Sequence, residues 1–269
     1  MNSPRIRLWS DLHIEMPGNR GILTQMPREA DADLVILAGD IGHGSDGVLR
    51  AANWFSDRPP IAYVLGNHEL YGGEYEAVLA ECREVARGTN VRVLERDVWD
   101  FMPRLRLLGC TLWTDYALWG EETIDAAMRE AYRMADFRLI RTEGRAFRPA
   151  DALRLHQESR AWLEAELARA KRDDVTVIVV THHAPHELLL EPEYREERAL
   201  LSASFASDLG AILDGPNSPW GWCSGHTHAA GSYARVVGST ALMRNQGGYR
   251  WMGECPDFEV AGLRLPPIA

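Results

Sequence analysis

Leu34-Val-Ile-Leu-Ala-Gly-Asp40 decides the fold class of this 269-residue chain. Its first five residues are all apolar, which predicts a strand buried on both faces, and Gly-Asp then ends the strand with a turn. Two further runs have the same form, Ile6 to Trp9 and Ile61 to Leu65, and the second is followed by Gly66 and Asn67. Buried strands of this kind are typical of sheets that are covered by helices. We therefore expect an α/β protein.

The rest of the chain alternates between helical and extended patterns. The predicted helices cover Val48 to Phe55, Glu74 to Arg87 and Ala150 to Lys171; a strand is expected over Val175 to Val180, another from Cys110 to Thr114 and a β-meander from Trp220 to Arg244. No Ser/Gly/Pro-rich linker interrupts the sequence, so we expect a single domain over residues 1–269.

Composition disfavours several functional classes. The net charge of -10 repels a phosphate backbone, so we expect no nucleic-acid partner. The longest apolar runs, Leu34 to Ala38 and Val177 to Val180, are far shorter than the roughly 20 residues that cross a bilayer, so we expect no membrane segment. The N-terminal sequence also lacks the pattern of a secretory signal, and the four cysteines form no C-x-x-C pair. These features favour a cytoplasmic protein with reduced thiols, and they predict no oligomeric state.

Eight of the nine histidines lie at or next to the end of a predicted strand. Ligands of open α/β sheets bind at the carboxyl ends of strands, so this placement indicates a site. Acidic and amide residues accompany the histidines in five short segments: Asp11-Leu12-His13, Gly39-Asp40, Gly66-Asn67-His68-Glu69, Thr181-His182-His183 and Gly225-His226-Thr227-His228. Any one of these segments is more often a structural turn than a ligand, but five of them together favour a metal site.

The residue types in these segments suit transition metals. Residues i and i+2 of an extended chain share a face, so Asp11 with His13, and His226 with His228, can each chelate an ion. Imidazole and carboxylate together suit Zn, Mn and Fe, and the Asp40 carboxylate can bridge two cations.

The order D-x-H, G-D, G-N-H-[DE], strand-end histidine and G-H-x-H resembles the calcineurin-like metallophosphoesterases over about 220 residues, from Asp11 to His228. The resemblance implies a sandwich of two mixed β-sheets flanked by helices, with a dinuclear metal centre at one rim. It places Asp11, His13 and His228 on one metal, Asn67, His182 and His226 on the other, and Asp40 between them. The implied cofactors are two divalent or mixed-valence ions of Mn, Fe or Zn. His182, which directly follows its strand, is the implied ligand, and His183 then lies behind it or faces the substrate.

The resemblance also implies a reaction. A hydroxide between the metals attacks phosphorus, while His68 contacts the phosphate and protonates the leaving oxygen. His68 and Asp40 are therefore the expected catalytic residues, and Glu69 is expected to orient His68 from behind. The expected activity is hydrolysis of a small phosphomonoester or phosphodiester, with no membrane partner. The alternative is a non-catalytic protein of the same fold that serves as an interaction module, but such a protein should have lost ligands, and none is missing here.

Three other segments have two interpretations each. Gly42 to Gly47 matches G-x-G-x-x-G, but Gly39-Asp40-Ile41 separates it from its strand, so we disfavour dinucleotide binding and favour a solvent-facing His43. Six arginines between Arg129 and Arg148 indicate either a helical cap insertion at about 116–150 that holds the substrate or a solvated helix with ion pairs to Glu130, Asp136 and Glu143; we favour the second. The acidic stretch Glu187 to Glu197 is either a loop over the site or an ordinary surface loop. The roles of His43, His183, His186 and Asp115 stay open.

Overall fold

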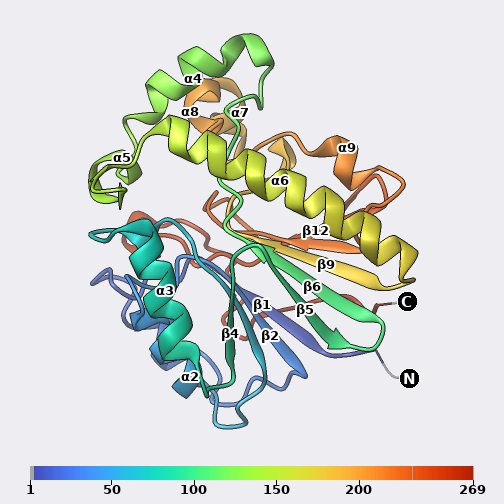
Figure 1. Cartoon of the computed structure of the whole chain (residues 1–269). Coiled ribbons are helices and arrows are strands. Elements are labelled where there is room, and N and C mark those ends of the chain that lie inside the picture. Colours follow the sequence, from blue (N-terminus) through green and yellow to red (C-terminus); the bar gives the residue numbers. More distant parts are fainter. Residues whose placement is uncertain (1–2, 232, 269) are drawn as a thin grey trace.

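Two β-sheets packed face to face form the centre of the molecule (Figure 1). The structure is a computed structural model that describes residues 3–231 and 233–268. The first sheet has the strand order β13-β1-β2-β3-β4, in which β1 to β4 are parallel and β13 is antiparallel. Its strands are β1 (Ile6–Trp9), β2 (Leu34–Ala38), β3 (Ile61–Val64), β4 (Val91–Leu94) and β13 (Leu263–Arg264).

The second sheet has the order β11-β12-β10-β9-β6-β5, with four parallel inner strands and an antiparallel strand at each edge. Its strands are β5 (Asp97–Met102), β6 (Leu105–Cys110), β9 (Thr176–Thr181), β10 (Gly221–Cys223), β11 (Tyr233–Val237) and β12 (Thr240–Arg244). The predicted β-meander is wrong, because β10 pairs in parallel with β12. The loop that carries His226 and His228 leaves the sheet after β10. The chain then returns as the β11–β12 hairpin, and β12 lies beside β10.

Helices cover the outer faces of both sheets (Figure 1). On the first sheet lie α2 (Asp46–Trp54) and α3 (Tyr75–Ala86), and on the second lies α6 (Pro149–Arg172), with Pro149 in its first turn as its fixed φ favours. The shorter helices are α1 (Ile22–Gln25), α4 (Ile124–Ala131), α5 (Asp136–Leu139), α7 (Pro192–Glu196), α8 (Ala199–Ser202), α9 (Gly210–Leu213), η1 (His68–Leu70), η2 (Glu121–Thr123), η3 (Glu187–Leu189) and η4 (Arg250–Met252); β7 (Arg141–Thr142) and β8 (Arg145–Ala146) form a small hairpin. The predicted α/β fold, with two mixed sheets flanked by helices, is confirmed.

The strands β2, β3 and β9 each contribute to two cores, and this is why each holds an uninterrupted apolar run. In β2, Leu34 and Ile36 pack between the sheets, whereas Val35 and Leu37 pack under the helices. A buried side chain of this size contributes about 1.5–3 kcal/mol to folding. Within the described residues, no helix is both long enough and apolar enough to cross a bilayer.

The segment after β6 differs from the prediction. The strand ends at Cys110, and Leu112 and Trp113 then adopt φ angles of 73° and 56°, which an extended strand does not contain. The chain therefore turns away from the sheet before Asp115. It continues into residues 116–150, which hold α4, α5 and the β7–β8 hairpin.

The carboxyl ends of β1, β2, β3, β9 and β10 meet at one rim of the sandwich. Asp11 follows β1, Asp40 follows β2 and His68 follows β3, all in the first sheet. His182 and His226 follow β9 and β10 in the second sheet. The site described next lies where these five loops converge.

Candidate metal centre

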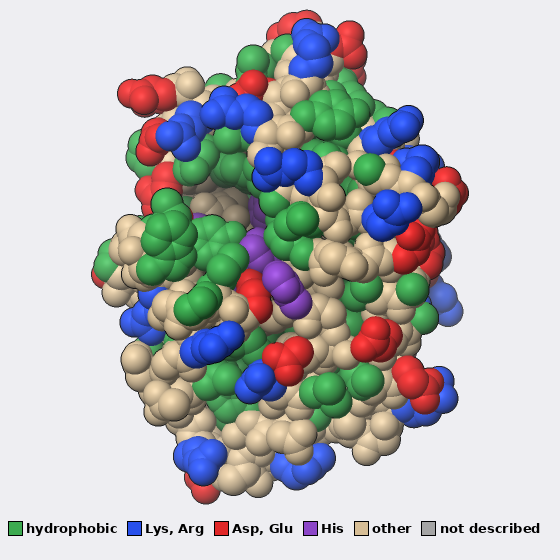
Figure 2. Space-filling view, turned by 90° about the vertical axis from the view of Figure 1, so that its left-hand side faces the viewer, with side chains coloured by type: hydrophobic (Ala, Val, Ile, Leu, Met, Phe, Trp, Pro, Cys, Tyr) green, Lys and Arg blue, Asp and Glu red, His purple; other side chains and the backbone are tan. Residues whose placement is uncertain are grey.

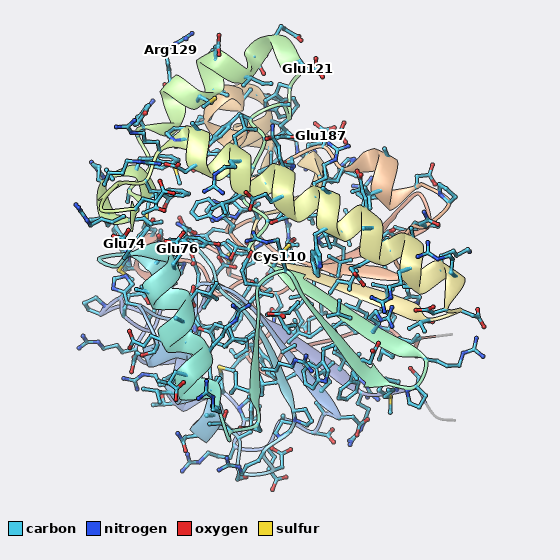
Figure 3. All side chains as sticks on the ribbon, viewed as in Figure 1. Glu74, Glu76, Cys110, Glu121, Arg129 and Glu187 are labelled. Atoms are coloured by element: carbon cyan, nitrogen blue, oxygen red, sulfur yellow. The ribbon has the colours of Figure 1, made fainter. Side chains whose placement is uncertain are left out.

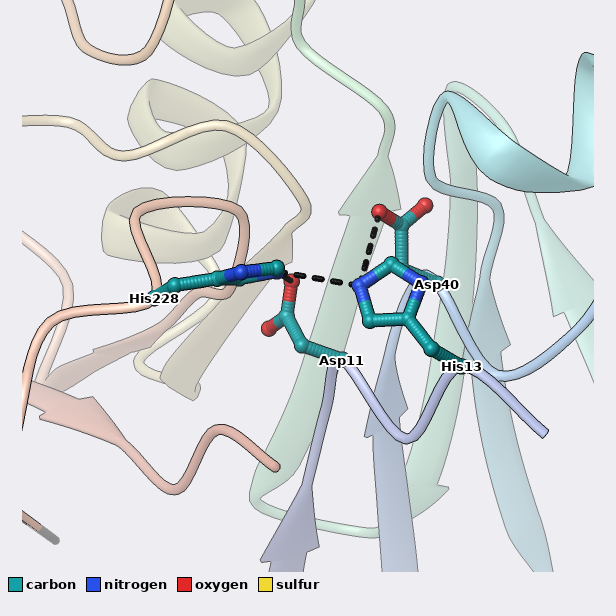
Figure 4. A group of neighbouring side chains, drawn as sticks. All are labelled: Asp11, His13, Asp40 and His228. Atoms are coloured by element: carbon teal, nitrogen blue, oxygen red, sulfur yellow. Dashed lines mark hydrogen bonds and ion pairs between the residues drawn. The ribbon is translucent and has the colours of Figure 1, made fainter. Parts of the chain in front are cut away.

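Asp11, His13, Asp40 and His228 form a first ligand group (Figure 4). Each side chain offers one ligand atom, and these four atoms lie within 4.8 Å of one another. His13 Nε2 is 3.0 Å from His228 Nε2 and 3.7 Å from Asp40 Oδ2. His228 Nε2 is in turn 3.3 Å from Asp11 Oδ1. These distances match the spacing of ligands that surround a single ion.

A second ligand group consists of Asp40, Asn67, His182 and His226. His182 Nε2 lies 3.0 Å from Asn67 Oδ1, 3.1 Å from His226 Nδ1 and 3.5 Å from Asp40 Oδ2. Asp40 belongs to both groups, so its carboxylate is placed between them. The structure thus brings together all seven residues that the resemblance singled out as metal ligands.

Hydrogen bonds orient three of the four imidazoles. The Nδ1 atoms of His13 and His228 lie 3.1 Å and 2.7 Å from the carboxylates of Glu15 and Glu254, and His182 Nδ1 lies 3.0 Å from the Ala38 carbonyl. Because these oxygens only accept, each Nδ1 carries the proton and donates it. The lone pairs of the three Nε2 atoms then face the ligand groups, the arrangement that metal-binding histidines require.

The donor set fits cations. Asp11 Oδ2 is buried and has no hydrogen-bond partner among the described residues. Burial lowers the pKa of His182, but the charge of Asp40, the hydrogen bond to its carboxylate and the charge of Asp11 together outweigh burial and raise that pKa to about 9. Positive charge is therefore stabilised at this rim, and two cations bound by the two ligand groups would supply it.

The backbone at the site is strained. Asp11, His13, Asp40, His226 and His228 have φ angles of 54°, 45°, 55°, 69° and 44°. Residues other than glycine rarely adopt positive φ, and such conformations gather at functional sites. Each of these loops reverses tightly at its strand end, which turns the side chain back over the rim.

Position 66 requires glycine because the backbone there lies directly against Asp40. A Cβ atom there would collide with the Asp40 carboxylate. Any side chain at this position would therefore displace the residue shared by both ligand groups.

Glu69 does not orient His68, so that expectation is wrong. Its carboxylate accepts hydrogen bonds from the backbone N–H groups of Asp40 (3.0 Å), Ile41 (2.8 Å) and Gly66 (2.7 Å) and from the Tyr63 hydroxyl (2.8 Å). His68 and Glu69 are consecutive residues of η1, so their side chains leave the helix in different directions. Burial, together with the charge of Asp40, raises the pKa of Glu69 to about 7. Glu69 thus holds the turns after β2 and β3 together.

Glu15 orients His68 instead. Its Oε1 atom lies 2.9 Å from His68 Nδ1 and 3.1 Å from His13 Nδ1, so one oxygen holds both rings. His68 Nε2 lies 2.9 Å from the Tyr249 hydroxyl. Burial lowers the pKa of His68, but Asp40 and Glu15 outweigh it and raise that pKa. Sequence reasoning missed Glu15, although its position two residues after His13 could have pointed to it.

Asp136 reaches the site from residues 116–150. It is buried, and its Oδ1 atom accepts hydrogen bonds from Asn67 Nδ2 (2.8 Å) and from the Tyr71 hydroxyl (2.6 Å). The first bond turns the amide so that Asn67 Oδ1 faces His182. The expected ion-pair role of Asp136 on a solvated helix is therefore wrong, because this carboxylate faces inward and orients a residue of the second ligand group.

Replacing Asp136 with alanine is expected to weaken binding of one of the two metals by about 10- to 100-fold, the usual cost of losing a group that orients a ligand. Asp136→Asn keeps an acceptor oxygen, so it should lose less. Competitive titration with a metal-binding dye measures both variants. Unchanged two-site binding in Asp136→Ala would show that Asn67 does not depend on this carboxylate.

The remaining residues with open roles lie in four different settings. His43 is 47% exposed at the rim, near Glu15, and lines the cavity described below. His183 is buried behind the site, where its ring contacts that of His226 and burial lowers its pKa to about 3. His186 accepts the Leu188 N–H at the start of η3, and Asp115 accepts the Ala117 N–H. His183, His186 and Asp115 are not among the described residues that line the cavity.

A cavity of about 800 Å³ opens over the two ligand groups, and Figure 2 shows the hollow with histidines at its base. The three segments with two interpretations all contribute to its wall, the first of them through His43. Residues 116–150 contribute Met134, Ala135 and Leu139, and the acidic stretch contributes Glu191, Glu193 and Tyr194. The six arginines do not line it within the described chain, and Arg129 projects outward from α4 (Figure 3). The prediction of solvated arginines agrees with this placement.

Comparisons with known proteins identify relatives of this fold. A family model described as calcineurin-like phosphoesterase matches residues 4–230. Among solved structures, the phosphopantetheinyl hydrolase of Mycobacterium tuberculosis superposes with a TM-score of 0.71 at 19% identity, covering 99% of this chain and 97% of that one. A dimetal phosphatase from Danio rerio superposes with a TM-score of 0.52 at 16% identity, covering 92% and 88%. No curated protein matches the sequence. Tyr249 and Glu254 lie beyond the residues that the family model matches.

Proposed function

Since the chain belongs to the calcineurin-like phosphoesterase family, we propose that it is a hydrolase that uses two metal ions to cleave a small phosphomonoester or phosphodiester. The observation that carries this proposal is the convergence of two ligand groups that share Asp40 at the base of one cavity. The fold alone would not identify a hydrolase, because one fold hosts many functions. The ligand set suits Mn, Fe and Zn alike.

The chemistry that two cations would supply when bound is activation of a water molecule as the nucleophile and neutralisation of the phosphoryl oxygens. The two ligand groups would hold those ions. His68 lines the same cavity, and Glu15 keeps its Nδ1 protonated. Nε2, which lies 2.9 Å from the Tyr249 hydroxyl, is then the atom that holds a proton and passes it to the leaving oxygen. Tyr249 supports that ring from the opposite side to Glu15.

The competing function is a non-catalytic interaction module of the same fold. A module of this kind has no need for a complete donor set, yet all seven residues of the two ligand groups are present with oriented imidazoles. The completeness of the set therefore favours the enzyme.

Metal analysis and hydrolysis of paired substrates test the proposal. We expect two metal ions per chain and turnover of p-nitrophenyl phosphate, bis-p-nitrophenyl phosphate or both, with activity lost after chelation and restored by Mn²⁺ or Zn²⁺. The ratio of the two rates identifies a monoesterase or a diesterase. Phosphopantetheine and its esters belong in the same panel, because the name of the Mycobacterium tuberculosis neighbour points to them. A metal-loaded protein that hydrolyses none of these esters would instead support the interaction module.

A further inference from the structure

The cavity extends well beyond the two ligand groups. Its volume of about 800 Å³ lies in the range that accommodates a drug-sized molecule, far more than one phosphate needs. The space beyond the ligands is bounded by α5 with the turn before it, by the segment from α7 to Phe205, and by η4. This space is available to the part of the substrate that does not react.

The wall of this outer space is mainly apolar. Met134, Leu139, Tyr194, Phe205 and Met252 all line it. Leu139 and Met252 are 44% and 57% exposed, so apolar surface borders the hollow, as Figure 2 shows beside the histidines. Exposed apolar surface around a polar site typically marks a contact with a ligand.

The charges of the outer wall disfavour a second anion. Arg198 is the single Lys or Arg among the described residues that line the cavity, and Glu193 pairs with it at 3.0 Å while Tyr194 lies under its guanidinium at 5.5 Å. Glu191 adds a further carboxylate, and Glu254 is paired with His228. A second phosphate in this space would therefore have to compete with Glu193 for the one arginine, and it would lie near the carboxylates of Glu191 and Glu193.

We propose that the cavity selects phosphate esters whose non-reacting part is an uncharged, extended alcohol, and that it discriminates against substrates with a second phosphate. This inference rests on the proposed function. The ligand groups would bind the one phosphate that reacts, and the apolar wall would bind the chain attached to it. Size alone does not explain the selection, because a chain with a terminal phosphate also fits a cavity of this volume.

Two substrates that differ only in a terminal phosphate test the inference. For a diesterase these are hexyl p-nitrophenyl phosphate and 6-phosphohexyl p-nitrophenyl phosphate; for a monoesterase, hexyl phosphate and 1,6-hexanediol bisphosphate. We expect kcat/KM to be at least about tenfold higher for the substrate without the second phosphate. Equal values, or a preference for the second phosphate, would overturn the inference.

A charge placed in the wall should change this preference. Leu139→Lys is expected to lower kcat/KM for the uncharged substrate and raise it for the doubly phosphorylated one, while Leu49→Lys, at a leucine of α2 that is equally exposed and lies outside the cavity, leaves both unchanged. The same change in both variants would also contradict the inference. If none of the phosphate esters in either panel is hydrolysed, the proposed function fails; if esters are hydrolysed without selection against the second phosphate, this inference alone fails.

Discussion

Asp40→Asn is expected to lower kcat by at least about 1,000-fold and to leave the protein with fewer than two bound metals. The Asp40 carboxylate is the side chain that both ligand groups share, 3.7 Å from His13 Nε2 and 3.5 Å from His182 Nε2. Asparagine has the same shape but no charge, so the groups lose the anion that offsets two cations. Inductively coupled plasma mass spectrometry of the dialysed protein, with single-turnover kinetics, measures both effects.

The asparagine variant should still fold. Its amide oxygen can accept the His68 N–H that Asp40 Oδ1 accepts at 2.9 Å. Asp115→Asn is the matched control, because Asp115 is also an aspartate that is not exposed but lies outside the cavity lining. Asp115→Asn should retain two metals and activity within about twofold of wild type. Full metal content and activity in Asp40→Asn would contradict a shared ligand.

His68→Ala is expected to retain both metals and to lose about 100-fold or more in kcat with an alkyl leaving group. His68 lines the cavity and Glu15 holds its Nδ1, so Nε2 is the ring atom left to deliver a proton. A p-nitrophenolate leaving group needs little protonation, so the loss with p-nitrophenyl esters should be less than about tenfold. Parallel assays of an alkyl and a p-nitrophenyl ester measure the difference.

His186→Ala is the control for His68→Ala. His186 is also a histidine in a loop that follows a strand, but its side chain accepts the Leu188 N–H and lies outside the cavity lining. The ratio of kcat in His186→Ala to kcat in wild type should be the same for the alkyl and the p-nitrophenyl ester. Two findings would remove His68 from the proton-transfer role: an equal loss on both esters, or a loss of metal in His68→Ala.

The local sequence was sufficient to predict the main strands and helices of the sandwich. Leu34–Ala38 and Ile6–Trp9 are strands with the predicted bounds, because burial on both faces leaves an uninterrupted apolar run that can be read directly. The pairing of β10 with β12 could not be read in this way. It depends on where the loop after β10 leaves the sheet, which the composition of the strands does not encode.

The ligand residues were also visible in the sequence, since short motifs such as Asp11-Leu12-His13 keep their ligands two residues apart. Their partners were not. Glu15 holds His68, which is 53 positions away, and Asp136 holds Asn67, which is 69 positions away. Glu254 reaches His228 from beyond the matched family segment.

The sequence by itself thus determined the α/β class and the residue types that can bind metals, because both depend on neighbouring residues along the chain. Only the tertiary structure decided that Glu15 rather than Glu69 supports His68. It also decided that residues 116–150 contribute Met134 and Leu139, rather than their arginines, to the wall of the cavity. Contacts between distant loops set these features, and a loop's direction in space depends on the packing of both sheets beneath it.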